Sequence, residues 1–261
     1  MDAMTLERWV PFRDDSAAVR CRLFAFPHAG GNAAFYRPLR RFMPPEIDFC
    51  AVELPGRATR LDETPFTAMS ALMQRLQQAL PPLMAMPFGF FGHSVGACIA
   101  YQAARQLRSP DGRPAMHLFV SGRGSPPART DVSAAPQLSD HELLAILDRF
   151  GGTPAAIMQH PELVAALLPA LRADLALAEG YGVEPGSLVD CPITAFGGAD
   201  DTSHSASPGS WRRFTSGQCR TRTFPGGHFY LSTAAELLAR EIVEDVRASL
   251  GLHASAAGSR A

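Results

Sequence analysis

The segment Gly92-His93-Ser94-Val95-Gly96 constrains the fold more than any other part of the sequence. It follows an apolar run at 88–91 and precedes a helical pattern over 95–107. A strand that becomes a helix this abruptly needs small neighbours, because the start of the helix passes close to the end of the strand. We therefore expect Ser94 in a strained turn. Its hydroxyl would lie at a helix N-terminus, where free N–H groups favour developing negative charge.

The rest of the chain repeats this alternation of short apolar runs and helical patterns, as expected for a parallel sheet covered on both faces. The predicted strands are 22–26, 48–53, 88–91, 117–121, 193–196 and 222–224, and the main predicted helices are 66–80, 95–107 and 233–250. The sequence therefore predicts an α/β protein with a mostly parallel sheet flanked by helices.

An insertion interrupts the alternation between residues 121 and 193, an interval too long for a plain crossover. Residues 124–136 are rich in Pro, Ser and Ala, which is typical of a linker. Ser139 and Glu142 then form a capping-box pattern ahead of one helix, and a second helical pattern starts at Pro161, with Pro169 expected to kink or break it. The two helices predict a lid, with packing at the sheet edge as the alternative.

These patterns give the expected domain boundaries. Residues 1–124 and 186–251 form the core, 125–185 the helical lid, and 252–261 a disordered tail of small and polar residues.

Composition excludes several classes of function. All 24 basic residues are Arg, so Schiff-base lysines and lysine-dependent phosphate loops are ruled out. The net charge of -1 gives no bulk attraction to nucleic acid or membranes, and neither is expected as a partner. Five scattered cysteines and no recognisable signal peptide or membrane span favour the cytoplasm.

A serine nucleophile needs a base and an acid further along the chain, in the order Ser, Asp, His. His228, in a loop after the last predicted strand, is the candidate base. Asp200 is the favoured acid because it lies nearer the end of strand 193–196, with Asp201 as the alternative. We expect His93 to be structural and to point away from the nucleophile. The remaining histidines are less well placed: His117, His141, His160, His204 and His253.

An oxyanion hole requires two N–H donors, normally from the residue after the nucleophile and from the loop after an early strand. Val95 would supply the first. The segment 26–31, Phe-Pro-His-Ala-Gly-Gly, nominates Ala29 for the second. As alternatives, Gly30 and Gly31 only form a turn or hold a phosphate.

Four motifs together resemble a known family. Phe-Pro-His-Ala-Gly-Gly at 26–31, Leu-Pro-Gly-Arg at 54–57, Phe-Gly-His-Ser-Val-Gly-Ala at 91–97 and Gly-Gly-His-Phe at 226–229 are similar, in order and spacing, to the type II thioesterases of polyketide and nonribosomal peptide synthesis. The family commonly has Met where this chain has Val95, which matters little because the backbone N–H is the donor. The resemblance implies an α/β-hydrolase fold with an inserted helical lid.

The resemblance further implies hydrolysis of stalled or aberrant acyl groups from the phosphopantetheine arm of acyl or peptidyl carrier proteins. No cofactor or metal is expected, and we expect a monomer. Because such carriers are generally acidic, Arg57 and Arg60 are docking candidates, with a solvated surface role as the alternative. The competing hypotheses are a general esterase of the same fold and a non-catalytic module that binds acyl groups or carriers.

Overall fold

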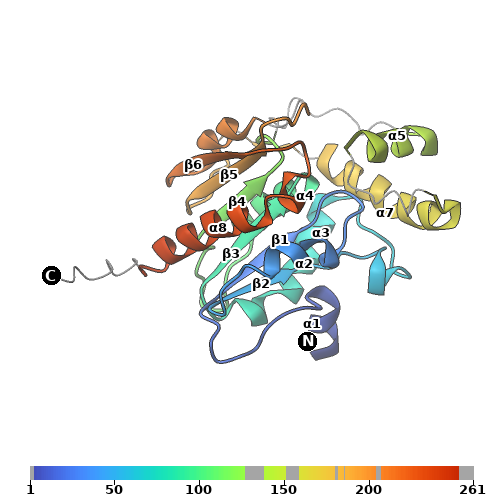
Figure 1. Ribbon diagram of the computed structural model, residues 1–261. Coiled ribbons are helices and arrows are strands. Elements are labelled where there is room, and N and C mark those ends of the chain that lie inside the picture. The colour runs from blue at the N-terminus through green and yellow to red at the C-terminus, as the bar shows by residue number, and fades with distance from the viewer. Residues whose placement is uncertain are drawn as a thin grey trace.

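The computed structural model describes residues 3–126, 138–150, 159–179, 182–184, 186–203 and 207–252. At its centre lies a six-stranded parallel sheet with strand order β2-β1-β3-β4-β5-β6 (Figure 1). The strands are β1 (Cys21–Phe26), β2 (Ile47–Ala51), β3 (Phe88–His93), β4 (Leu118–Ser121), β5 (Ile193–Gly198) and β6 (Cys219–Phe224). Each predicted strand is confirmed, with bounds that move by at most a few residues.

Helices cover both faces of the sheet. One face carries α1 (Ala3–Trp9), α3 (Met69–Ala79) and α4 (Val95–Gln106), and the other carries α2 (Arg37–Arg40) and α8 (Ala235–Ser249). Side chains alternate along β3, so that Phe90 joins the first core and Phe91 the second. This alternation gives two apolar layers with a strand buried between them, as expected for a parallel sheet.

The three main predicted helices are confirmed as α3, α4 and α8, whereas α1 and α2 were not predicted. Both are short, at 7 and 4 residues, and too short to show a helical period. Short 3-10 helices connect the larger elements: η1 (Ala33–Tyr36), η2 (Ala58–Arg60), η3 (Pro81–Met84), η5 (Pro208–Phe214) and η6 (Tyr230–Ser232).

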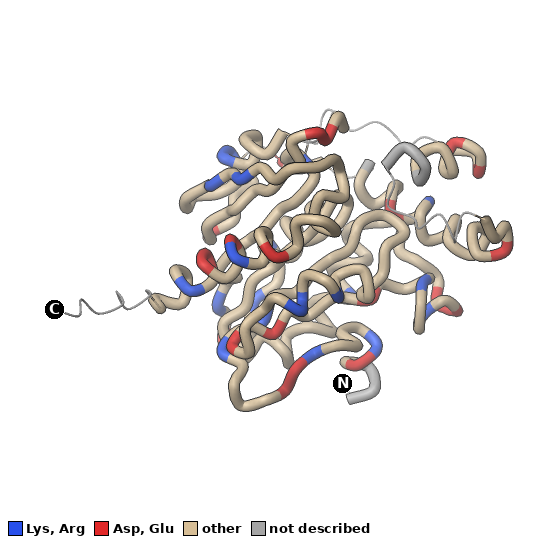
Figure 2. Tube along the Cα trace, viewed as in Figure 1, with Lys and Arg blue, Asp and Glu red and all other residues tan. Residues whose placement is uncertain are grey.

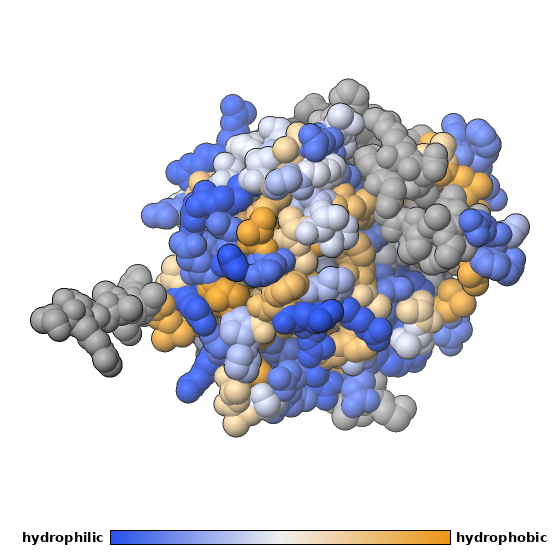
Figure 3. Space-filling model, in the orientation of Figure 1, coloured by the Kyte–Doolittle hydropathy of each residue, from blue (hydrophilic) through white to orange (hydrophobic). Residues whose placement is uncertain are grey.

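Two helices, α5 (Asp140–Phe150) and α7 (Pro161–Glu179), form the described part of the insertion and lie beyond the carboxyl ends of the strands (Figure 1). The capping box at α5 is confirmed, because the Glu142 carboxylate accepts from the Ser139 N–H at 2.7 Å. Of the two effects expected at Pro169, a kink or a break, the break is wrong, because α7 continues through it. The outer end of α7 exposes Leu163, in a region where Figure 3 shows hydrophobic surface.

Parts of the prediction lie outside the described residues. They include most of the linker at 127–137, the tail at 253–261, and His204 and His253. Among the helices that the structure describes, none is long and apolar enough to cross a membrane.

Charges of both signs are interspersed over the molecule, as Figure 2 shows along α8. Glu236 and Arg240, for example, pair one turn apart on that helix at 2.6 Å. The near-zero net charge thus arises from mixed surfaces.

The start of α4 is pressed against the ends of β1 and β3. A Cβ added at Gly92 would lie 2.0 Å from the Gly96 carbonyl oxygen, and one added at Gly96 would lie 2.0 Å from the Phe26 carbonyl oxygen. Both distances are far below van der Waals contact, so only glycine fits at either position. The contact sets the spacing between β1, β3 and α4.

Replacing Gly96 with Ala should therefore lower the free energy of unfolding by about 3 kcal/mol or more, because backbone rather than a flexible side chain must move. Gly209→Ala is the matched control, since an added Cβ there meets nothing within 4 Å. Urea unfolding of both variants measures the difference. Equal midpoints for the two would contradict the steric account.

Candidate active site

Ser94 lies between β3 and α4 with φ 56° and ψ -118°. A positive φ is costly for a residue with a Cβ, so the surrounding packing must hold it. The Ser94 N–H donates to the Ser121 carbonyl at the end of the neighbouring strand β4, at 2.8 Å. Within the described part of the chain, the Ser94 side chain caps no N–H of α4. The strained turn predicted from the sequence is confirmed.

His228 is held by Asp201, whose Oδ2 lies 2.8 Å from the imidazole Nδ1. Both side chains are buried, at 8% and 2% exposure. The expectation that Asp200 holds His228 is therefore wrong. The Asp200 N–H is bound to the Gly226 carbonyl at 2.9 Å and the residue is exposed, so the turn after β5 directs the next carboxylate, that of Asp201, inward.

The carboxylate of Asp201 is held in its charged form. Burial by itself would raise the pKa of Asp201, but hydrogen bonds from Ser203 and His228 outweigh it and lower the pKa below its ordinary value. The Ser203 N–H donates to Oδ1 at 3.0 Å, which leaves Oδ2 for the imidazole. A charged carboxylate at Nδ1 fixes the tautomer in which Nε2 accepts a proton.

His93 was expected to be structural and to point away from the nucleophile. Its ring packs against the ring of His228, 5.0 Å between centroids. Its Nδ1 lies 2.9 Å from the Ser121 hydroxyl. Burial, together with His228 and His28, lowers the pKa of His93 well below its ordinary value, so the ring is neutral near pH 7. His93 thus packs beside His228 without adding a charge.

The sequence did not predict that His28 would join the same cluster. Its ring packs edge-on against Phe35 at 4.4 Å and against Phe229 at 4.7 Å. Burial above all lowers the pKa of His28 to about 3, so this ring is also neutral near pH 7. His28 begins the turn that contains Ala29, because its carbonyl accepts from the Gly31 N–H at 2.9 Å, so its ring fixes one side of Ala29.

The two nominated oxyanion donors directly follow two neighbouring strands of the sheet. Ala29 follows β1, and Val95 is the first residue of α4 after β3. The sheet order reverses between β1 and β3, the position at which open α/β sheets form a crevice for ligands. The N–H of Val95 also precedes the first intrahelical donor and is not used by the helix. The structure thus brings both loops together at the carboxyl ends of β1 and β3.

Arg57 and Arg60 are not surface residues, so both sequence-based interpretations of them are wrong. Arg57 is 3% exposed and forms two hydrogen bonds with Asp174 of α7, at 2.6 and 2.9 Å. Arg60 is 4% exposed, binds Glu63 at 2.6 Å and stacks over the ring of Trp9. Neither guanidinium is accessible to a carrier protein.

Glu53, close to both arginines, is a buried acid with an unusual protonation. Burial raises its pKa to about 7, against the opposing effects of the Ala33 N–H and the two guanidinium groups. Oε2 accepts from Ala33 at 3.3 Å, while Oε1 has no hydrogen-bond partner among the described residues.

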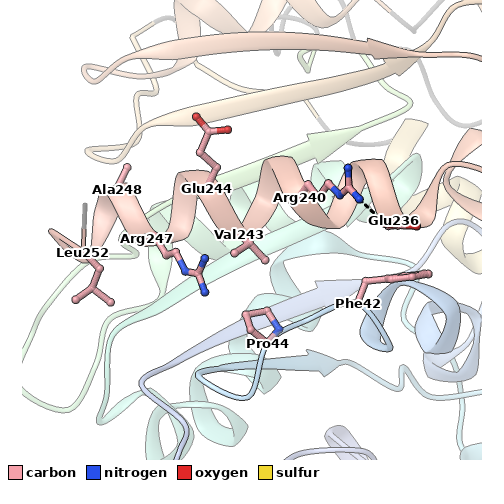
Figure 4. Close-up of a pocket in the computed structure, with 9 residues that line it drawn as sticks. All are labelled: Phe42, Pro44, Glu236, Arg240, Val243, Glu244, Arg247, Ala248 and Leu252. Atoms are coloured by element: carbon pink, nitrogen blue, oxygen red, sulfur yellow. Dashed lines mark hydrogen bonds and ion pairs between the residues drawn. The ribbon is translucent and has the colours of Figure 1, made fainter. Parts of the chain in front are cut away.

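No group of three or more His, Cys, Asp or Glu side chains among the described residues is arranged to hold a metal ion. The groove in Figure 4, with a volume of about 640 Å³, lies between α8 and the segment around Phe42 and Pro44. It contains neither Ser94 nor His228, so it is separate from the candidate active site.

Comparison with known proteins assigns the family. The thioesterase domain model matches residues 21–250. The gramicidin S biosynthesis protein GrsT of Aneurinibacillus migulanus is 35% identical over 227 residues, which cover 87% of this chain and 89% of GrsT. The chain belongs to the thioesterase family.

Solved structures agree with this assignment. The RedJ thioesterase of the prodiginine pathway of Streptomyces coelicolor has a TM-score of 0.78 and 33% identity, covering 88% of this chain and 91% of RedJ. The type II thioesterase BorB from the borrelidin biosynthetic cluster has a TM-score of 0.78 and 35% identity, covering 92% of this chain and 98% of BorB. The resemblance to type II thioesterases and the α/β-hydrolase fold are confirmed.

The two adjacent aspartates of this thioesterase allow a matched test of the acid. Asp201→Asn should lower kcat by about 10⁴, because an amide at Nδ1 favours the wrong imidazole tautomer. Asp200→Asn should leave kcat within about threefold, since its side chain is exposed. Steady-state thioester hydrolysis measures both, and a larger loss from Asp200→Asn would contradict the geometry.

Glu53 predicts a pH dependence of stability. The folded carboxyl keeps its proton up to about pH 7, whereas its ordinary pKa is 4.5, so the folded state binds more protons between these values. This contribution, about 3 kcal/mol, is present in full below pH 4.5 and is lost as the pH rises through 7.

Glu53→Gln should therefore flatten the fall in urea stability between pH 5 and pH 8. Glu63→Gln is the control that should leave this slope unchanged, because the hydrogen bond from Arg60 lowers the pKa of Glu63 and keeps its carboxylate ionised from pH 5 to pH 8. The same pH slope in wild type and Glu53→Gln would show that Glu53 titrates normally.

Proposed function

We propose that the protein hydrolyses acyl thioesters carried on the phosphopantetheine arm of acyl or peptidyl carrier proteins, removing stalled or aberrant acyl groups from a polyketide or nonribosomal peptide synthase. The observation that carries the proposal is the Asp201–His228 pair, at 2.8 Å, beside the strained Ser94 turn. The relatives named for antibiotic-type pathways support the substrate class.

In the proposed mechanism, the Ser94 hydroxyl attacks the thioester carbonyl while His228 Nε2 takes its proton. The N–H groups of Ala29 and Val95 stabilise the oxyanion of the tetrahedral intermediate. As this intermediate collapses, the carbon–sulfur bond breaks and His228 returns the proton to the leaving thiolate. The products of this half-reaction are the free carrier thiol and an acyl ester on Ser94.

Water completes the cycle. His228 removes a proton from water as it attacks the acyl ester, and then donates it to the Ser94 oxygen as the carboxylic acid leaves. Asp201 remains a carboxylate throughout and stabilises the imidazolium that forms twice in the cycle.

We further propose that α5 and α7 act as a lid. Their place beyond the carboxyl ends of the strands supports this role, as does the contact of α7 with the loop after β1. A lid suits an acyl group delivered by a long flexible arm, because closure would keep water from the tetrahedral intermediate until the thiol has left.

The substrate class is tested by comparing acetyl, propionyl and longer acyl groups on a carrier protein, on a small thiol and on an oxygen ester. Wild type should prefer the carrier-bound thioesters, and Ser94→Ala should lower kcat by at least about 10⁴ on all of them. Equal or faster hydrolysis of the oxygen esters would instead indicate a general esterase. Failure of a serine-directed phosphonate to label Ser94 would indicate a non-catalytic binding module.

A further inference from the structure

Three charged side chains hold the loop that follows β1, and one of them comes from the inserted helices. The Gly30 N–H donates to Asp174 Oδ2 at 2.8 Å, and the Gly31 carbonyl accepts from Arg57 at 3.1 Å. The Ala33 N–H donates to Glu53 at 3.3 Å. Glu53 and Arg57 belong to the segment after β2, whereas Asp174 is 144 residues further along the chain than Gly30. The loop is thus held jointly by the core and by α7.

The contact between α7 and this loop is close. Leu171 lies one turn before Asp174 on the helix, and its Cβ would be 3.6 Å from a Cβ added at Gly30. Leu171 and Asp174 are 1% and 2% exposed. The same face of α7 therefore presses on the loop and binds its backbone.

The Asp174 carboxylate is fully engaged in this arrangement. It accepts one hydrogen bond from the Gly30 N–H and two from the Arg57 guanidinium. Arg57 in turn donates to the Pro55 and Gly31 carbonyls. A buried bidentate pair with these further bonds has little freedom to reorient, so the position of Asp174 fixes that of the Gly30 N–H.

The Gly30 N–H belongs to the peptide directly after Ala29. On the other side of Ala29, the His28 ring packs against Phe35 and Phe229, and the His28 carbonyl accepts from the Gly31 N–H at 2.9 Å. Because the peptide before Ala29 and the peptide after it are both held, the direction of the Ala29 N–H is fixed. Loss of the hydrogen bond from the Gly30 N–H to Asp174 would release the peptide after Ala29.

We infer that Asp174 is a positioning residue for the oxyanion donor Ala29, so that the oxyanion hole is complete only while α7 is docked on the loop. The inference rests on the proposed function, because it assigns Ala29 the oxyanion role. A purely structural ion pair would affect stability alone, whereas a positioning residue affects kcat in a protein that is still folded.

Two double variants separate these roles. Arg57→Met/Asp174→Asn removes both buried charges but keeps an amide oxygen that can accept from the Gly30 N–H. Arg57→Met/Asp174→Leu removes both charges and the acceptor. Because each pair removes both charges together, neither leaves a buried charge unpaired. Thermal unfolding establishes that the two are comparably folded.

We expect the kcat of Arg57→Met/Asp174→Leu to lie about tenfold to a hundredfold below that of Arg57→Met/Asp174→Asn, with the two KM values within about threefold of each other. Asp140→Asn is the matched control: Asp140 forms an exposed ion pair with Arg172 of α7 and should leave kcat unchanged. Equal kcat values for the two double variants at equal Tm would overturn the inference.

If Arg57→Met/Asp174→Leu does not fold, Arg57→Met/Asp174→Ala takes its place, because it also removes both charges and the acceptor for the Gly30 N–H. It should lower kcat at least about threefold relative to Arg57→Met/Asp174→Asn with KM unchanged, and equal kcat values would overturn the inference. Ser94→Ala, assayed alongside, tests the proposed function separately. If Ser94→Ala remains active, the proposed function fails, whereas an inactive Ser94→Ala with insensitive Asp174 variants rejects the positioning role alone.

Discussion

The geometry of the candidate site depends on one close contact, between the first turn of α4 and the carboxyl ends of β1 and β3. Only glycine at positions 92 and 96 allows backbone to approach this closely. The contact forces Ser94 into its positive φ and places the loop after β1 beside the helix N-terminus. The proposed nucleophile and the proposed oxyanion donors thus follow from a single packing constraint at the point where the strand order reverses.

Electrostatics then separates the side chains around Ser94 by role. Burial keeps His28 and His93 neutral near pH 7, and both serve as packing for the loop and for the ring of His228. Asp201 is buried as well, but hydrogen bonds keep it ionised. The negative charge of Asp201 therefore acts on one imidazole, that of His228. The charge pair of Arg57 and Asp174 instead holds the backbone of the loop after β1.

The sequence predicted the sheet, the Ser94 turn and His228 because each depends on local pattern. Apolar runs indicate strands, and the segment 92–96, with a glycine at each end between a strand and a helix, permits few conformations. Local pattern could not decide between Asp200 and Asp201, because the choice depends on the hydrogen bond between the turn after β5 and Gly226, in the loop after the neighbouring strand β6. The burial of Arg57 was hidden for a similar reason: its partner lies 117 residues away on α7. The continuity of α7 through Pro169 likewise reflects tertiary packing that outweighs local propensity.

Rapid-quench mass spectrometry of the protein mixed with an acyl-loaded carrier protein tests most directly whether Ser94 is the nucleophile. The triad mechanism predicts a transient covalent adduct that adds the acyl group in place of one hydrogen, located on the Ser94 side chain by fragmentation of the peptide that contains it. Turnover without any such adduct, or an adduct located on a residue other than Ser94, would contradict this mechanism.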